Sequence, residues 1–404
     1  MSTDNRIGVL HFASASVRGG AEEHMLMLLT HLDRTRFRPM LAAPAGLIEL
    51  LRPDLPEDID AVPVTLGTFP YLESAWKFAR MLSRRRVDIL HSHMFQSSRL
   101  ASPLGCMARV PVVIETPHVR EHWRKGWIRG SYFVDRLVAR CVTTFIAVSE
   151  ANGKYLRCEK RLPEGKILVI RNGSSIERFD PEHVAPPALR VQLGIDHQAP
   201  VALVLARLEP QKGHCVLLEA WKEVIRLYPR ARLVCVGDGV LRTELEAQAF
   251  ALGIGCAVSF VGQQPNVPDW LALADFTVLP SFYEGLPLAA IESLAAGRPV
   301  VATAVDGTSE VVIDGKTGLT VPAGDAVALA AAISRMLAAP ELVRILGRAG
   351  RRFALKHFTR QRQVQQTEAL YLNAWRQARG RRGAGVTDLP GTGAKREVLI
   401  GQTK

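Results

Sequence analysis

The stretch Ser281-Phe282-Tyr283-Glu284-Gly285-Leu286-Pro287-Leu288-Ala289-Ala290-Ile291-Glu292 follows a short apolar run, Phe276–Leu279. The run has the length and composition of a buried strand. Pro287 suits the first turn of a helix, where its missing N–H costs nothing, and Gly297 suits the position just past the end of that helix. Strand, loop and helix in this order are the βα unit of a parallel sheet.

The alternation extends outward from this stretch over most of the 404 residues. Short apolar runs alternate with longer amphipathic ones, which is typical of parallel sheets with crossover helices. A proline-rich stretch at 180–187 without periodicity separates two such series and is interpreted as a linker. Strands are expected at 7–12, 87–90, 112–114, 145–148 and 167–170, and after the linker at 201–205, 233–236, 258–261, 276–279 and 300–302.

Two series predict an α/β fold with two doubly wound domains, residues 1–180 and 181–355, that face each other across a cleft. Ligands of such sheets bind beyond the carboxyl ends of the strands, so the cleft is the expected site. Residues 379–404 are rich in Gly, Arg and Lys without periodicity, and they are predicted to form a mobile tail.

Composition narrows the class of protein and the cellular compartment that can be expected. Hydrophobic residues make up 48% and charged residues 22%, as in soluble globular proteins. The six cysteines form no C-x-x-C pair, and neither a secretory signal nor an apolar stretch of about 18 residues is evident, so a cytoplasmic location is expected. The net charge of +12 indicates an anionic partner, and charge alone does not choose among nucleotide, nucleic acid and acidic lipid.

The helix start in the quoted stretch is a predicted phosphate site. Backbone N–H groups at the start of a helix lack partners within it and attract anions. Glu284 and Glu292 flank this point, roughly 8 Å or more apart along the axis, and a carboxylate can accept hydrogen bonds from two sugar hydroxyls. The alternative is that Glu284 offsets the helix dipole and Glu292 is solvated. The amides would come from Gly285, Leu286, Leu288 and Ala289.

A second segment supports the phosphate reading. Arg207 and Lys212 follow directly on the strand expected at 201–205, and Gly213 allows a sharp turn into the next helix. Two cations beyond the carboxyl end of a strand can neutralise a diphosphate, with Arg207 forking across two oxygens and Lys212 acting as a point charge. An ordinary solvated loop is the alternative for this segment alone. Together the two segments indicate a nucleotide sugar as ligand.

These segments resemble the retaining glycosyltransferases of family 4, which have the GT-B fold of two Rossmann-like domains. The family's paired glutamates, in an E-G-x-x-x-x-x-x-E setting, match Glu284 through Glu292, and its G-R-L-x-x-x-K-G element matches 206–213 with Ala206 in place of the first glycine. A second departure lies at Asp306-Gly307-Thr308-Ser309-Glu310, where the family usually has paired glycines. The resemblance covers residues 6–375 and includes the glycine-rich elements at 19–22, 236–239 and 260–262.

The resemblance implies roles for individual residues. Arg207 and Lys212 would hold the diphosphate as it leaves, Glu284 would contact the transferred sugar and Glu292 the ribose. His118 would reach across the cleft toward the reacting carbon. The helix at 356–378 would pack back onto the first domain. Further donor contacts are implied for Gly19, Gly20, Gly237 and Gly262 and for the backbone of Gly285, Leu286, Leu288 and Ala289.

The reaction implied is transfer of a hexose or N-acetylhexosamine from a UDP-, GDP- or ADP-sugar to a hydroxyl of a glycan or lipid-linked acceptor, with retention of configuration, in cell-envelope or exopolysaccharide synthesis. No metal site and no cofactor are expected. The D-x-D triplet Asp58-Ile59-Asp60 lies far from the second segment and is interpreted as a solvated turn. His91 and His93 lie near a strand end without an evident third ligand, so packing or acceptor contact is expected there.

Segment 120–140 interleaves basic and aromatic residues, which suits an interfacial helix on an anionic membrane. The alternative is a core-facing tryptophan pair with a solvated basic face. The segment suggests a peripheral enzyme on the cytoplasmic face of a membrane. Its members are Arg120, Arg124, Lys125, Arg129, Arg136 and Arg140 with Trp123, Trp127, Ile128 and Phe133.

Other classes fit the sequence less well. A dinucleotide-dependent oxidoreductase has a similar pattern of elements, but Gly237-Asp238-Gly239 is not followed by the third glycine of G-x-G-x-x-G. A nucleic-acid-binding module would account for the pI of about 9.7, but the basic residues are dispersed and no groove-reading motif is evident, so no nucleic-acid partner is expected. An inactive family member is disfavoured by the presence of Arg207, Lys212, Glu284 and Glu292.

Overall fold

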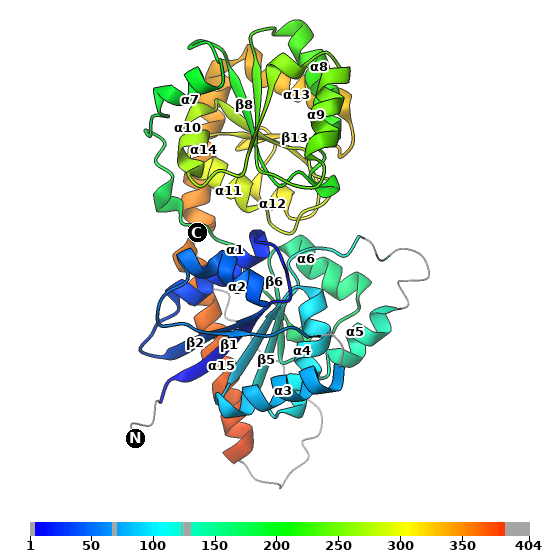
Figure 1. The fold of residues 1–404 in the computed structure, drawn as a ribbon, viewed down its shortest axis with the longest axis vertical. Coiled ribbons are helices and arrows are strands. Elements are labelled where there is room, and N and C mark those ends of the chain that lie inside the picture. The colour runs from blue at the N-terminus through cyan, green and yellow to red at the C-terminus, as the bar shows by residue number, and fades with distance from the viewer. Residues whose placement is uncertain (1–4, 67–70, 123, 125–130, 384–404) are drawn as a thin grey trace.

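The computed structural model describes residues 5–66, 71–122, 124 and 131–383. Figure 1 shows two α/β units, one above the other along the long axis of the molecule. The first sheet has the strand order β3-β2-β1-β4-β5-β6-β7 and is parallel throughout. Its strands are β1 (Ile7–Phe12), β2 (Phe37–Ala43), β3 (Asp60–Pro63), β4 (Ile89–His93), β5 (Val112–Thr116), β6 (Thr144–Ala147) and β7 (Ile167–Val169).

The second sheet is also parallel and has the order β10-β9-β8-β11-β12-β13. Both orders are of the doubly wound type, in which the first strand of each sheet lies beside the fourth. The prediction of two doubly wound α/β units is therefore confirmed. The strands are β8 (Val201–Leu205), β9 (Arg232–Val236), β10 (Val258–Gly262), β11 (Phe276–Leu279), β12 (Val300–Thr303) and β13 (Gly318–Val321).

Helices cover both faces of each sheet (Figure 1). Buried aliphatic side chains of sheet and helices form two core clusters in the second unit and four in the first. In the first unit the helices are α1 (Gly20–His31), α2 (Ala45–Leu51), α3 (Tyr71–Arg84), α4 (Phe95–Met107), α5 (Tyr132–Val138) and α6 (Glu150–Lys154). They are followed by α7 (Pro187–Gln192), α8 (His214–Leu227), α9 (Arg242–Ala251), α10 (Val267–Leu273), α11 (Leu288–Ala295), α12 (Thr308–Val311), α13 (Ala326–Ala338), α14 (Pro340–His357) and α15 (Arg360–Gly383).

The order of the strands fixes where each sheet can bind a ligand. The switch point of the second sheet lies between β8 and β11, and that of the first lies between β1 and β4. Neighbouring crossovers leave a sheet in opposite directions at such a point and open a crevice at the carboxyl ends of the strands. The segments that carry Arg207 and Glu284 follow β8 and β11, so both segments begin at this crevice.

All ten expected strands are present, and β2, β3 and β13 were not predicted. β2 is an interior strand, although it contains Pro39, which its register places opposite Val9. A proline within an apolar run argues against a central strand, so the sequence of 37–43 does not have the local pattern of one. β3 and β13 have four residues each, which is too short for a distinct period.

The helix expected at 356–378 is divided in the structure. α14 runs to His357, and α15 begins at Arg360 and extends to Gly383, so the first residues of the predicted tail are helical. Thr359 caps α15, since its Oγ1 accepts a hydrogen bond of 3.3 Å from the N–H of Arg362. Tyr371 of α15 is buried in a core cluster of the first sheet, and Figure 1 shows α15 (orange-red) running along this unit. Residues 384–404 lie outside the described part of the chain.

No single helix among the described residues combines the length and the hydropathy of a membrane span. The pair α13 and α14 meets both criteria only when taken together, across a break bent by 100°.

Candidate active site

A cavity of about 580 Å³ is lined by residues of both units. It lies at the switch points of the two sheets, since its walls include the loops after β1, β5, β8 and β11. The cavity collects most of the residues that the sequence singled out. They are Gly19, Gly20, His118, Arg207, Lys212, Glu284, Gly285, Leu286, Leu288, Ala289 and Glu292.

The loop after β8 presents both predicted cations to the cavity. Lys212 Nζ lies 2.6 Å from Glu284 Oε1, and Arg207 Nη1 lies 2.5 Å from Glu209 Oε1. Gly213 ends this loop with a φ of 67°, and a Cβ there would meet the carbonyl oxygen of Pro280 at 2.1 Å. Only glycine fits such a turn without strain, so Gly213 sets where Lys212 stands relative to the loop after β11.

The loop after β11 leads into α11 and places the two glutamates on either side of the helix start. Glu284 is buried and accepts a second hydrogen bond, of 2.7 Å, from Ser281 Oγ. Glu292 lies in the second turn of α11 and accepts a hydrogen bond of 3.3 Å from Ser174 Oγ. Burial, followed by the nearby Glu23 carboxylate, raises the pKa of Glu292 to about 7. Gly297 follows α11 with a φ of 71°, as expected of the residue past the helix end.

Gly237 and Gly262 do not line the cavity. The N–H of Gly237 donates a hydrogen bond of 2.9 Å to the carbonyl oxygen of Gly262, which ties together the ends of β9 and β10. A Cβ on Gly237 would lie 2.0 Å from the carbonyl oxygen of Ala206. Both glycines have positive φ values, and Gly237 packs against the backbone of the Arg207 loop.

His118 brings the first unit close to the second. It follows β5, is buried, and its carbonyl oxygen would lie 1.8 Å from a Cβ on Gly285. Burial, with His24 nearby, holds the pKa of His118 well below the usual histidine range, so the ring is neutral at pH 7. His118 Nε2 lies 3.3 Å from His93 Nδ1.

Several further residues of the cavity were not singled out from the sequence. The rings of Tyr283 and His122 stack across the two units with centroids 4.1 Å apart. Asn172 makes two hydrogen bonds. Its Oδ1 lies 2.9 Å from His24 Nδ1, and its Nδ2 donates to the carbonyl oxygen of Leu286 at 3.4 Å. No periodicity marks these residues, and only the tertiary structure brings segments so distant in the chain to one wall.

The D-x-D triplet at 58–60 and the pair His91 and His93, neither of which was expected to bind a metal, differ in their surroundings. Asp58 pairs with Arg34 Nε at 2.6 Å, and Asp60 pairs with Arg85 Nε at 2.7 Å, so these carboxylates serve surface ion pairs. His91 and His93 belong to a buried set of histidines whose ring nitrogens approach one another within 4.8 Å. Both nitrogens of His91 are engaged, by Tyr371 Oη at 2.5 Å and Thr116 Oγ1 at 2.7 Å.

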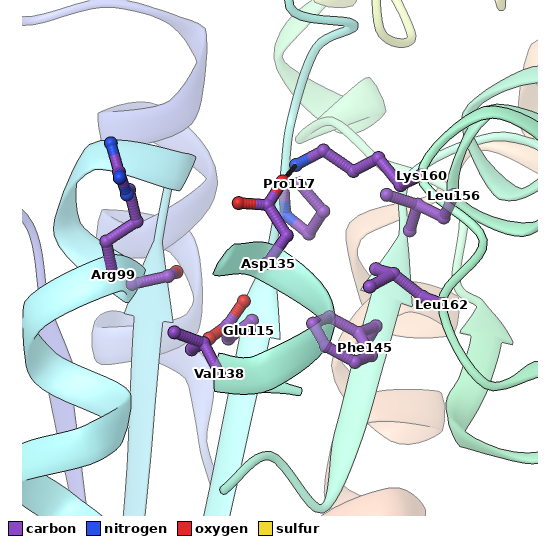
Figure 2. A pocket seen from close by; sticks show the side chains of 10 residues that line it. Arg99, Glu115, Pro117, Asp135, Val138, Phe145, Leu156, Lys160 and Leu162 are labelled. Carbon is purple, nitrogen blue, oxygen red and sulfur yellow. Dashed lines mark ion pairs between the residues drawn. The ribbon is translucent and has the colours of Figure 1, made fainter. Parts of the chain in front are cut away.

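Segment 120–140 uses two of its cations in ion pairs, one of them buried. Arg124 is buried and pairs with Asp135 at 2.6 Å, and Arg120 pairs with Glu159 at 2.7 Å. Asp135 also contacts Lys160 at 3.1 Å, beside a cavity of about 20 Å³ that Figure 2 shows. The interleaved residues Trp123, Lys125, Trp127, Ile128 and Arg129 lie outside the described residues.

Comparisons with known proteins agree with this geometry. The profile described as "Glycosyl transferases group 1" matches residues 187–353, and "Glycosyl transferase 4-like domain" matches residues 19–173. The UDP-Gal:alpha-D-GlcNAc-diphosphoundecaprenol alpha-1,3-galactosyltransferase of Escherichia coli is 27% identical over 260 residues, 63% of this chain and 67% of that protein. The GDP-mannose-dependent alpha-(1-6)-phosphatidylinositol monomannoside mannosyltransferase of Mycolicibacterium smegmatis is 34% identical over 308 residues, 73% and 79% of the two chains.

The fold is shared with solved structures at lower identity. Anabaena HepE in complex with UDP and glucose superposes with a TM-score of 0.80 at 21% identity, over 91% of this chain and 100% of that one. Both units of the chain are thus matched in sequence and in structure. The chain therefore belongs to the group 1 glycosyltransferases, enzymes of the GT-B fold that transfer a sugar from a nucleotide-sugar donor.

Proposed function

We propose that this glycosyltransferase moves a hexose or N-acetylhexosamine from a UDP-, GDP- or ADP-sugar to a hydroxyl of a glycan or lipid-linked acceptor, with retention of the anomeric configuration. One observation carries the proposal. Arg207, Lys212, Glu284, Glu292 and the start of α11 all face a single cavity. Two cations and a helix start suit a diphosphate, and two carboxylates suit the sugars on either side of it.

The chemistry follows from where charge develops. The bond between the anomeric carbon and the donor phosphate oxygen breaks through an oxocarbenium-like state, and negative charge grows on the leaving diphosphate. Arg207, Lys212 and the first N–H groups of α11 would stabilise that charge. The acceptor hydroxyl attacks from the face that the diphosphate leaves, its oxygen bonds the anomeric carbon, and its proton passes to a donor phosphate oxygen. No nucleophile from the protein is required.

The names of the relatives support the donor and acceptor classes. One is named for a UDP-galactose donor and a diphosphoundecaprenol acceptor, and the other for a GDP-mannose donor and a phosphatidylinositol mannoside. Both names combine a nucleotide sugar with a lipid-linked acceptor. By analogy we place this enzyme in cell-envelope or exopolysaccharide synthesis.

Two measurements test the proposal. Thermal-shift screening against UDP-, GDP- and ADP-sugars should give one nucleotide class that stabilises the protein by about 2.7 kcal/mol at a hundredfold excess over its Kd. Proton NMR of the first product should show the anomeric configuration of the donor. A protein that none of the nucleotide sugars stabilises would refute donor binding, and a product of opposite configuration would refute retention.

We also propose a cytoplasmic enzyme that contacts an anionic membrane through segment 120–140. The support is the exposed face of α5, where Phe133 is 65% and Leu137 49% exposed, with Arg140 exposed beyond the helix. Apolar side chains beside cations suit a lipid headgroup region. In flotation with phosphatidylglycerol vesicles, the double variant Phe133→Ser, Leu137→Ser should lose binding, whereas Phe250→Ser, an exposed position on α9, should retain it. Equal flotation of both variants would contradict this surface.

A further inference from the structure

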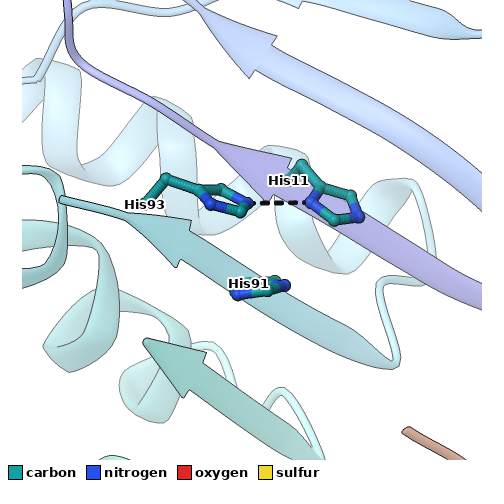
Figure 3. Close-up of side chains that lie close together, drawn as sticks. All are labelled: His11, His91 and His93. Carbon is teal, nitrogen blue, oxygen red and sulfur yellow. Dashed lines mark hydrogen bonds between the residues drawn. The ribbon is translucent and has the colours of Figure 1, made fainter. Parts of the chain in front are cut away.

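Five histidines are packed together in the first unit, directly behind the cavity wall. Figure 3 shows His11 on β1 with His91 and His93 on β4, near the carboxyl ends of these strands. All five are buried, and burial lowers the pKa of each below the usual histidine range, to about 3 for His11 and about 4 for His24. They are His11, His24, His91, His93 and His118.

Three of these rings form a hydrogen-bonded chain that ends at the cavity. His11 Nδ1 lies 2.9 Å from His93 Nε2, as the dashed line in Figure 3 marks, and His93 Nδ1 lies 3.3 Å from His118 Nε2. His118 lines the cavity. A neutral imidazole carries one N–H and one acceptor nitrogen, so both bonds can be made only if all three rings point their N–H groups in the same direction along the chain.

The inner end of the chain selects that direction. His11 Nε2 is buried without a hydrogen-bond partner among the described residues. If the N–H groups pointed inward, His11 Nε2 would carry a buried N–H with no acceptor, which native structures tolerate less well than an unused acceptor. The N–H groups therefore point outward, from His11 to His93 and from His93 to His118. The proton of the His118 ring is then on Nδ1.

A metal ion is a poorer account of the same cluster. The sets His11, His91, His93 and His24, His93, His118 each have ring nitrogens within 4.8 Å of one another. Binding an ion through the first set would break a bond from His91 to Tyr371 or Thr116, and the second set would break the chain at His93. Hydrogen bonds already account for both nitrogens of His91 and of His93.

We propose that His93, itself bonded to His11, is a positioning residue that holds His118 as its Nδ1–H tautomer, so that His118 donates a hydrogen bond to the sugar of the donor. The contact with the sugar rests on the proposed function, but the tautomer does not. A tautomer set by the bond at the second ring nitrogen is a general property of histidine. His11 and His93 are buried and do not line the cavity themselves.

The test is a tautomer measurement that needs no substrate. In protein labelled with ¹⁵N-histidine at pH 7, long-range ¹⁵N–¹H correlation should show His118 with a protonated Nδ1 and an unprotonated Nε2. His93→Leu removes the donor to His118 Nε2 and should convert His118 to a mixture of tautomers, with kcat/KM lower by about tenfold, the worth of one hydrogen bond. His93→Asn, whose side-chain amide can replace the Nδ1–H, should restore both readouts.

The matched control is His91→Gln, in the same cluster but outside the chain, which should leave the His118 shifts unchanged. A protonated Nε2 on His118 in the unsubstituted protein would overturn the proposal without any variant. If the tautomer is as proposed but kcat/KM is unaffected in a folded His93→Leu protein, the positioning role is refuted. If no nucleotide sugar binds while the tautomer is confirmed, the failure lies with the proposed function instead.

Discussion

Two basic residues hold the positive charge of the cavity in fixed positions. Lys212 and Arg207 each contact a carboxylate, at 2.6 Å and 2.5 Å, so both cations are already held near the place where a diphosphate would lie. Cations fixed in advance need no reorganisation when charge develops on the leaving group. The contact with Lys212 explains why Glu284 can be buried, since a buried carboxylate requires a partner.

Replacing either cation tests this arrangement. Lys212→Ala and Arg207→Ala should each lower turnover on the order of 10²–10³-fold, as for loss of one preorganised donor. The measurement is steady-state kinetics with the donor identified by thermal shift. Lys222→Ala removes the same charge from an exposed position on α8 and should leave turnover unchanged. Normal rates in both cavity variants would refute the assignment.

Glu292 should make donor binding depend on pH. Its raised pKa, about 7, means that the carboxyl group becomes protonated as the pH falls below 7, and a protonated carboxyl accepts fewer hydrogen bonds from a ribose. The KM for the donor should rise by up to about tenfold between pH 7.5 and 6, the limit for binding to the ionised form alone. Glu292→Gln should bind more weakly with a flat profile. If the Glu292→Gln variant keeps the dependence of KM on pH, another titrating group causes that dependence.

Short elements and their turns set the geometry of the site. The loop from β8 to α8 passes so close to Pro280 that its last residue, Gly213, has no room for a side chain. The loop after β11 passes as close to the first unit, since a Cβ on Gly285 would lie 1.8 Å from the carbonyl oxygen of His118. These contacts join backbone to backbone, so they leave less freedom than side-chain contacts would.

Two glycines with similar φ values allow the cost of backbone strain to be measured apart from the cost of steric crowding. Gly213 and Gly194 have φ of 67° and 61°, but a Cβ on Gly194 would meet nothing within 4 Å. Gly194→Ala should therefore cost only the left-handed backbone penalty, about 1–2 kcal/mol. Gly213→Ala should cost more and should also lower turnover, because Pro280 or Lys212 must move. Urea unfolding measures the first effect and steady-state kinetics the second. Equal losses of stability would mean that the turn relaxes freely.

The whole molecule distributes its titrating groups unevenly. The first unit holds five buried histidines with lowered pKa values. It also holds three buried carboxyls whose pKa burial raises, Glu22, Glu121 and Glu115, the last to about 7. In the second unit, His214 with a pKa lowered to about 4 is offset by Glu292 with a pKa of about 7. Mild acid should therefore act mainly on the first unit.

The sign of this effect follows from proton binding. Below pH 6.5 the unfolded chain protonates histidines that the folded chain keeps neutral, so stability falls as the pH falls toward their folded values. Glu115 acts in the opposite direction between pH 7 and its unfolded value of 4.5, because the folded state keeps its proton. The free energy of unfolding should therefore decrease from pH 6 to 4, and hydrogen exchange corrected for intrinsic rates should show the first unit opening before the second.

A variant sharpens the test. Glu115→Gln removes one of the opposing groups and should make the loss of stability in acid steeper. If the two units lose protection together, or if the melting temperature is constant between pH 6 and 4, the histidine cluster does not control acid stability.

Much of the fold was predictable because it rests on local patterns. Each βα unit needs an apolar run, a loop and an amphipathic run, and these are visible along the chain without knowledge of contacts. Arg207, Lys212, Glu284 and Glu292 could be singled out because they follow directly on strands, where the carboxyl ends of a parallel sheet must open. β2 was missed because Pro39 has the local character of a loop, although its neighbours on both sides complete the sheet.

The amino-acid sequence by itself determined the two doubly wound sheets, the turns at Gly213 and Gly297, and the charges at the strand ends, because each depends on residues close together in the chain. Only the tertiary structure decided that Tyr283 stacks on His122 and that His11, His93 and His118 form one chain. These contacts join segments from tens to hundreds of residues apart. Their pairing is set by strand order and domain approach, which no local pattern of side chains encodes.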